Sequence, residues 1–189
     1  MFQDARRVER EPPRRIVVIG SAGAGKAELA QAIAQRLRIP FYPLETYYWR
    51  PGWERPSDEE WAAQVSTLAA RDAWVMSGTF PATLEMRVAR ADWLVYLDLP
   101  MPVCFFRGLK RMLSRTSPKG DELAPGCPRR FDGALLRFIW NFPADVAPRL
   151  MGLIGRERRN RAIFILRSKR EVEDFLAHVP VVGDLGSSP

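Results

Sequence analysis

A glycine-rich turn between a strand-like run and a helix-like run constrains this chain more than any other feature. The run RIVVIG (residues 15–20) is apolar and rich in β-branched residues, which is typical of a buried parallel strand. The following stretch, GSAGAGKA (residues 20–27), matches the phosphate-binding pattern G-x-x-x-x-G-K-[ST] at its first seven positions. From Lys26 onward, apolar residues recur at helical spacing. This order predicts a phosphate-binding loop in an α/β fold.

The loop predicts ATP binding through its backbone and one lysine. Glycines let backbone N–H groups turn inward around phosphate oxygens, the helix N-terminus adds a positive end, and Lys26 supplies a full charge. The eighth position is Ala27, which lacks the hydroxyl that normally ligates Mg²⁺. Magnesium held only by phosphates and water remains possible. The predicted nucleotide-binding residues of the loop are Gly20, Ser21, Ala22, Gly23, Ala24, Gly25, Lys26 and Ala27.

The rest of the chain alternates strand-like and helix-like segments, which predicts a parallel sheet with helices on both faces. Capping boxes begin helices at Ser57 and Ser168, and Pro143 and Pro148 are expected to break or kink the helical run that starts near residue 131. We expect one domain over residues 15–179, a flexible arm at 1–14, a loose tail at 180–189 and a lid at about 114–130. Further strands are predicted near residues 41–44, 73–78, 92–100 and 161–168, and helices near 26–37, 82–89, 102–113, 131–142 and 169–179.

The charge and composition of the chain limit which classes of molecule it is expected to bind. The formal net charge is +7, and residues 105–170 hold 16 Lys and Arg against 5 Asp and Glu, a local charge of +11. Such a field attracts anions, and both phosphorylated metabolites and nucleic acids qualify. The sequence has no recognisable DNA-binding motif, no apolar run long enough for a membrane span and only two cysteines. We therefore expect a globular cytoplasmic protein without a membrane partner, a disulfide framework or a protein-ligated metal site.

Three motifs carry a family resemblance. They are YYWRPGW (residues 47–53), ARADWLVYLDLP (89–100) and GCPRRFDGALLRFIWNFP (126–143). In order and spacing the chain resembles the adenylate-kinase-like P-loop proteins known as DNA topology modulation proteins of the FlaR type. The resemblance implies a three-layer nucleoside-monophosphate-kinase-like P-loop NTPase fold, with a five-stranded parallel sheet in the order 2-3-1-4-5, ATP on the loop and a lid.

The chain departs from the family pattern where a metal would be held. Ala27 replaces the loop hydroxyl, and Ser77 stands where the family has an aspartate after the third strand. After the second strand the family aspartate is replaced by Glu45. These changes leave three functions open: a kinase that transfers the ATP γ-phosphate to a small acceptor, a non-catalytic nucleotide-binding or sensing protein, and a basic protein associated with nucleic acid.

Candidate site residues outside the loop fall into two groups. Glu45, at the end of a parallel strand, is the expected catalytic carboxylate for an acceptor hydroxyl. The resemblance implies that, of Arg107 and Arg111, one stacks on the adenine and the other reaches the phosphates beside the catalytic Lys26 of the loop. It also implies that Ser168 and Lys169 border the adenine. The remaining candidates would bind the phosphate acceptor, with tryptophans that stack on a base and arginines that hold an anionic group. They are Trp49, Arg50, Trp53, Arg87 and Arg130.

Overall fold

The computed structural model describes residues 12–113, 124–128 and 132–182. At its centre is a five-stranded, all-parallel sheet in the order β2-β3-β1-β4-β5, as the sequence predicted. The central strands contain apolar residues with no solvent exposure, because helices cover both faces of the sheet. The strands are β1 (Arg15–Gly20), β2 (Phe41–Pro43), β3 (Trp74–Ser77), β4 (Trp93–Leu97) and β5 (Ala162–Leu166).

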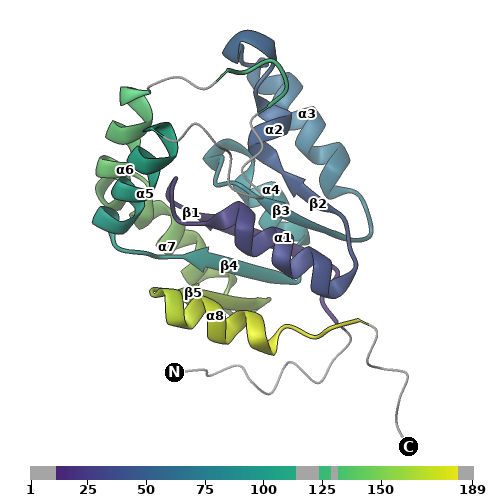
Figure 1. The fold of residues 1–189 in the computed structure, drawn as a ribbon. Coiled ribbons are helices and arrows are strands. Elements are labelled where there is room, and N and C mark those ends of the chain that lie inside the picture. The colour runs from purple at the N-terminus through teal and green to yellow at the C-terminus, as the bar shows by residue number, and fades with distance from the viewer. Residues whose placement is uncertain (1–11, 114–123, 129–131, 183–189) are drawn as a thin grey trace, which may run out of the picture.

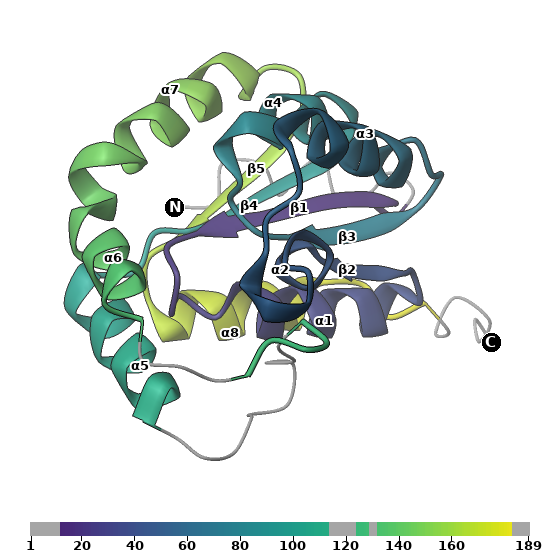
Figure 2. The ribbon, with the colours of Figure 1, turned by 90° about the horizontal axis from the view of Figure 1, so that it is seen from above.

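Two layers of helices cover the two faces of the sheet, and a further pair of helices lies at one end of it (Figures 1 and 2). One core cluster packs α1 (Lys26–Leu37) and α8 (Lys169–His178) against one face of the sheet. A second cluster packs α3 (Asp58–Ala69), α4 (Pro81–Arg90) and α7 (Ala147–Glu157) against the other. Helices α5 (Met101–Leu113) and α6 (Gly133–Asp145) lie together beyond the carboxyl ends of the strands. The phosphate loop follows the central strand β1 and therefore lies at the same carboxyl end of the sheet.

Most predicted elements are present, and the capping residues explain where several begin. Ser57 accepts a hydrogen bond from the backbone of Glu60, whose side chain in turn accepts one from the backbone of Ser57. Ser168 caps α8 through the backbone of Glu171. Two short elements escaped the sequence analysis: α2 (Leu44–Tyr48) and the 3₁₀ turn η2 (Pro51–Trp53).

The helical run breaks between its two prolines, as predicted, although Pro143 itself does not end a helix. Helix α6 continues through Pro143 to Asp145, and the chain bends instead at Val146. Pro148 lies in the first turn of α7, where a proline costs little because its missing N–H has no intrahelical partner. A separate helix, α7, therefore follows where only a disrupted run was expected.

Backbone hydrogen bonds fix both ends of the main described part of the chain to neighbouring elements. The backbone N–H of Arg14 donates to the Asp92 carboxylate at 2.9 Å. The N–H of Val182 donates to the carbonyl of Arg36 at 2.9 Å.

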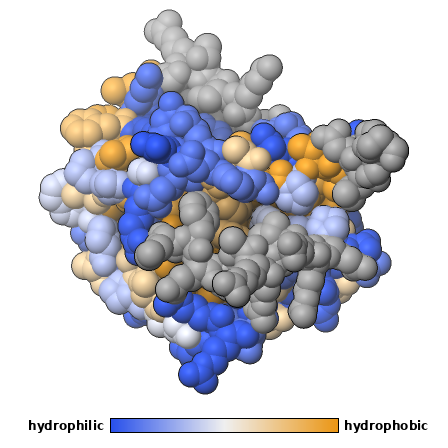
Figure 3. Space-filling model, turned by 90° about the horizontal axis from the view of Figure 1, so that it is seen from below, coloured by the Kyte–Doolittle hydropathy of each residue, from blue (hydrophilic) through white to orange (hydrophobic). Residues whose placement is uncertain are grey.

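No helix of the described residues is long and apolar enough to cross a membrane. Figure 3 shows one face of the molecule, on which hydrophilic side chains predominate.

Candidate functional site

The phosphate loop connects β1 to α1, and its glycines are required by close packing. Gly20, Gly23 and Gly25 have φ of 149°, 77° and 90°. A Cβ on Gly20 would lie 2.6 Å from the carbonyl oxygen of Leu97, and one on Gly23 would lie 2.3 Å from that of Cys104. Both neighbours are backbone atoms, so the loop has no room for side chains there. The loop is thereby held between β4 and α5.

Lys26 is buried at the start of α1, with its ammonium group turned back into the loop. Its Nζ donates to the carbonyl of Ser21 at 2.9 Å. Burial lowers the pKa of Lys26, while the Glu45 carboxylate acts in the opposite direction. The hydroxyl of Ser21 is buried and has no hydrogen-bond partner among the described residues. A buried cation, an unpaired hydroxyl and a glycine cradle fit a bound phosphate group.

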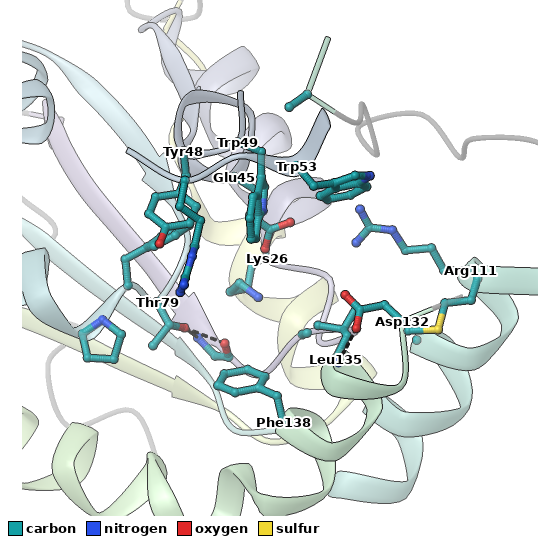
Figure 4. A pocket seen from close by; sticks show the side chains of 18 residues that line it. Lys26, Glu45, Tyr48, Trp49, Trp53, Thr79, Arg111, Asp132, Leu135 and Phe138 are labelled. Atoms are coloured by element: carbon teal, nitrogen blue, oxygen red, sulfur yellow. Dashed lines mark hydrogen bonds between the residues drawn. The ribbon is translucent and has the colours of Figure 1, made fainter. Parts of the chain in front are cut away.

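A cavity of about 550 Å³ opens beside the loop. Figure 4 shows Lys26 and Glu45 between two walls, with Trp49 and Trp53 on one side and Phe138 on the other. The lining combines the loop, α2, η2, the β3–α4 turn, α5 and the start of α6. The lining residues are Gly20, Ala22, Lys26, Glu45, Tyr48, Trp49, Trp53, Arg55, Thr79, Phe80, Pro81, Gly108, Arg111, Met112, Ala124, Asp132, Leu135 and Phe138.

The wall opposite the loop is a cluster of aromatic rings that pack on one another. Tyr48 lies 5.0 Å from Trp49 and 4.9 Å from Phe80 between ring centroids, and Trp49 lies 5.4 Å from Trp53. Trp53 and Phe80 both have positive φ, 64° and 33°, a backbone region that is costly for bulky residues. We call these four residues the aromatic wall. Rings locked in this way can contact a ligand without losing side-chain entropy on binding.

Arg87, expected to bind substrate, is instead buried beneath this wall with no solvent exposure. Its guanidinium donates to the carbonyls of Gly78 at 2.9 Å, Thr79 at 2.6 Å and Phe80 at 3.3 Å. Burial lowers its pKa to about 9, so it remains charged at neutral pH. The carbonyl partners satisfy that charge and brace the strained turn at Phe80. Arg87 therefore supports the cavity from behind and has no face open to a ligand.

The other predicted residues divide between the cavity and its surroundings. Arg111 lines the cavity, and Arg107 lies beside the loop, since its Nη1 would be 3.7 Å from a Cβ on Gly25. Arg50 points away and forms an ion pair with Glu60 at 3.0 Å. At the start of α8, Ser168 serves as the helix cap and Lys169 pairs with Glu173 at 3.3 Å, both outside the cavity lining. Arg130 lies outside the described residues.

The segment 124–128 is attached to the turn that carries the aromatic wall. The N–H of Gly52 donates to the carbonyl of Gly126 at 3.0 Å, and the indole N–H of Trp53 donates to that of Pro128 at 3.0 Å. The thiol of Cys127 donates to the carbonyl of Arg50 at 3.1 Å. We call residues 124–128 the cover segment. Its contacts join the end of the predicted lid to the wall, an association that spacing in the sequence did not indicate.

Several lining residues were missed by the sequence analysis. Thr79 donates to the carbonyl of Gly20 at 2.6 Å and so ties the β3–α4 turn to the loop. Asp132 caps α6 by accepting from Ala134 and Leu135, and its carboxylate also faces the cavity. Phe138 belongs to the aromatic run RFIWNF, for which helical spacing alone did not separate a lining residue from a core residue. Arg55 lies outside every motif that the sequence analysis recognised.

The residues near the loop offer few ligands for a metal. Ala27 has no donor side chain, and Ser77 is buried and absent from the cavity lining. In the part of the chain that the structure describes, no group of three or more His, Cys, Asp or Glu side chains could hold a metal ion. A Mg²⁺ ion at this site would therefore depend on phosphate oxygens and water, with Glu45 or Asp132 nearby.

Comparison with solved structures shows proteins that share this fold. The chain is similar to an unliganded sugar kinase from Janibacter sp. HTCC2649, with 14% identity, a TM-score of 0.51, and coverage of 94% of this chain and 100% of that one. It is also similar to shikimate kinase from Acinetobacter baumannii in complex with shikimate, with 15% identity, a TM-score of 0.51, and coverage of 87% and 89%. No family model and no curated protein matches the chain. The fold is that of the kinase-like P-loop NTPases.

Proposed function

We propose that this protein binds ATP and transfers its γ-phosphate to a hydroxyl of a small acceptor bound against the aromatic wall. The observation that carries the proposal is that Lys26 and Glu45 face the same cavity. One belongs to the phosphate loop and the other to α2 at the end of β2, so phosphate and acceptor groups can meet between them. The motif resemblance to the FlaR-type proteins and the kinase-like fold support this assignment.

The chain's own residues divide the work of such a transfer. When bound, ATP supplies the phosphoryl group. Lys26 and the loop amides neutralise phosphate charge, and Arg111 adds a cation from the opposite side of the cavity. Glu45 orients the acceptor hydroxyl and accepts its proton. The aromatic wall excludes water from the reacting groups, which strengthens the electrostatic interactions inside.

The test has a binding step and a transfer step. Isothermal titration with ATP and ADP, with and without Mg²⁺, should show binding in the micromolar to millimolar range, about the span of typical enzyme substrates. A screen for ADP release against hydroxyl-bearing metabolites should then identify an acceptor, and Glu45→Gln should lower kcat more than it changes the Kd for ATP. Absence of nucleotide binding under both conditions would overturn the proposal.

A second candidate is a non-catalytic nucleotide-binding protein, and Ala27 together with buried Ser77 motivates it. Without a side chain that ligates the metal, the loop would hold nucleotide through its amides and Lys26 alone. If this candidate is correct, the affinity for ATP does not change with Mg²⁺, and no phosphoryl transfer to any acceptor is observed. Phosphoryl transfer by the native chain would exclude it.

A further inference from the structure

Arg55 is a cation in the cavity lining that no group of the described residues engages. It follows η2, lines the cavity near the aromatic wall and is exposed to solvent. Among the described residues, none forms a hydrogen bond or an ion pair with its guanidinium. A long cationic side chain in a cavity lining, without a protein partner, is available to a ligand.

The other acceptor-side arginines in the described structure are engaged by the protein itself. Arg50 is paired with Glu60, and Arg87 is buried and satisfied by backbone carbonyls. Lys26, on the loop side, donates to the carbonyl of Ser21. Of these three arginines, Arg55 is the one that lines the cavity and has no partner among the described residues.

We propose that Arg55 binds an anionic group, a carboxylate or a phosphate, on the acceptor, and so selects acceptors that carry both an anion and a hydroxyl. This inference rests on the proposed function. A planar guanidinium binds either anion through two parallel N–H donors. Glu45 and Asp132 line the same cavity and repel an anion, so the anionic end is directed to Arg55 and the hydroxyl end to Glu45.

The test uses three probes that share one aromatic ring: benzyl phosphate, phenylacetate and benzyl alcohol. Their dissociation constants are measured by ligand-observed NMR on the full chain, with and without saturating ADP, because the phosphate loop also attracts anions. The variants are Arg55→Gln, Arg55→Lys and, as a matched control, Arg156→Gln. Arg156 is exposed on α7 and pairs with Glu85 of α4. Thermal unfolding confirms that each variant is folded.

We expect at least one anionic probe to bind about tenfold more tightly than benzyl alcohol, as a charge-assisted hydrogen bond predicts. Arg55→Gln should abolish this preference, Arg55→Lys should restore part of it, and Arg156→Gln should leave it intact. The tighter of the two anions identifies the group as carboxylate or phosphate. The inference is overturned if no probe binds, if all three bind equally, or if the preference survives Arg55→Gln.

One further comparison separates this inference from the proposed function. The preference should persist in Lys26→Ala, which removes the cation of the phosphate loop but leaves Arg55 in place. Loss of the preference in Lys26→Ala would mean that the anion was bound at the loop, and would overturn the inference. Failure of the native chain to bind ATP would overturn the proposed function, while the anion preference in Lys26→Ala would still report on Arg55.

Discussion

The loop side and the acceptor side of the cavity are built by different means. On the loop side, backbone meets backbone: Gly20 and Gly23 approach the carbonyls of Leu97 and Cys104 so closely that no side chain fits. On the acceptor side, large side chains from α2, η2 and the β3–α4 turn pack on one another. The loop side is therefore shaped by the path of the backbone, whereas the opposite side is shaped by the packing of its aromatic side chains.

The two sides also differ in where their support lies. The loop is flanked by β1 and α1 and packs against the backbone of Leu97 in β4 and Cys104 in α5. The wall depends on Arg87, which braces the turn at Phe80 from the next helix, and on the cover segment, whose Pro128 lies 75 residues from Trp53 in the sequence. Substitutions can therefore damage one side and leave the other intact, and the following predictions use that difference in order of decreasing effect.

Arg87→Met should have the largest effect. It leaves the carbonyls of Gly78, Thr79 and Phe80 buried without their donor, and such losses cost about 3–5 kcal/mol of unfolding free energy. Chemical denaturation measures the change, and Arg90→Met serves as control because Arg90 makes one long hydrogen bond to Ala69. An unchanged unfolding free energy would show that the turn does not need its brace.

Lys26→Ala should weaken ATP binding by about 10- to 100-fold, the range expected for a charge-assisted hydrogen bond to phosphate. The protein should remain folded, because the lysine carries a desolvation cost that alanine lacks. Isothermal titration gives the affinity, with Lys169→Ala as control on an exposed ion pair. Equal affinities of wild type and Lys26→Ala would place the nucleotide away from the loop.

Trp53→Phe should loosen the cover segment without removing the ring from the wall. The substitution deletes the hydrogen bond to Pro128, worth about 1 kcal/mol, so access to buried Cys127 should rise about fivefold. Thiol labelling followed by mass spectrometry measures the rate, with fully buried Cys104 as an internal reference.

Trp140→Phe is the matched control for that experiment, because Trp140 is 60% exposed on α6 and lies outside the cavity lining. It should leave the labelling rate of Cys127 unchanged. If Trp53→Phe also leaves the rate unchanged, the cover segment is held independently of the aromatic wall.

Ala27→Ser should have the smallest effect, a few-fold increase in the dependence of ATP affinity on Mg²⁺. The added hydroxyl restores one ligand at the start of α1, but Mg²⁺ takes most of its ligands from phosphates and water. Titrations with and without Mg²⁺ measure it, and Ala70→Ser at the exposed end of α3 is the control. A Mg²⁺ response no larger than that of the control would show that position 27 lies outside the metal's reach.

The sequence by itself determined the sheet, its order through the family resemblance, and the phosphate loop. The strand, the loop and the helix starts follow from local signals, namely a β-branched run, glycines at fixed spacing, and Ser57 and Ser168 as caps. The strand order does not follow from such signals and was implied by the resemblance alone. The short helices α2 and η2 and the separate helix α7 escaped prediction, because a single turn or a proline-containing run carries little periodic signal.

Only the tertiary structure decided which side chains face the cavity. Arg50, Arg55 and Arg87 look alike in the sequence, yet one pairs with Glu60, one faces the cavity and one is buried. The environment of each arginine depends on how η2, α3 and α4 pack around the sheet. That packing brings together residues that are far apart in the chain. Sequence spacing reports the period of one element, whereas the direction of a long arginine side chain is decided by the neighbours that tertiary packing places around it.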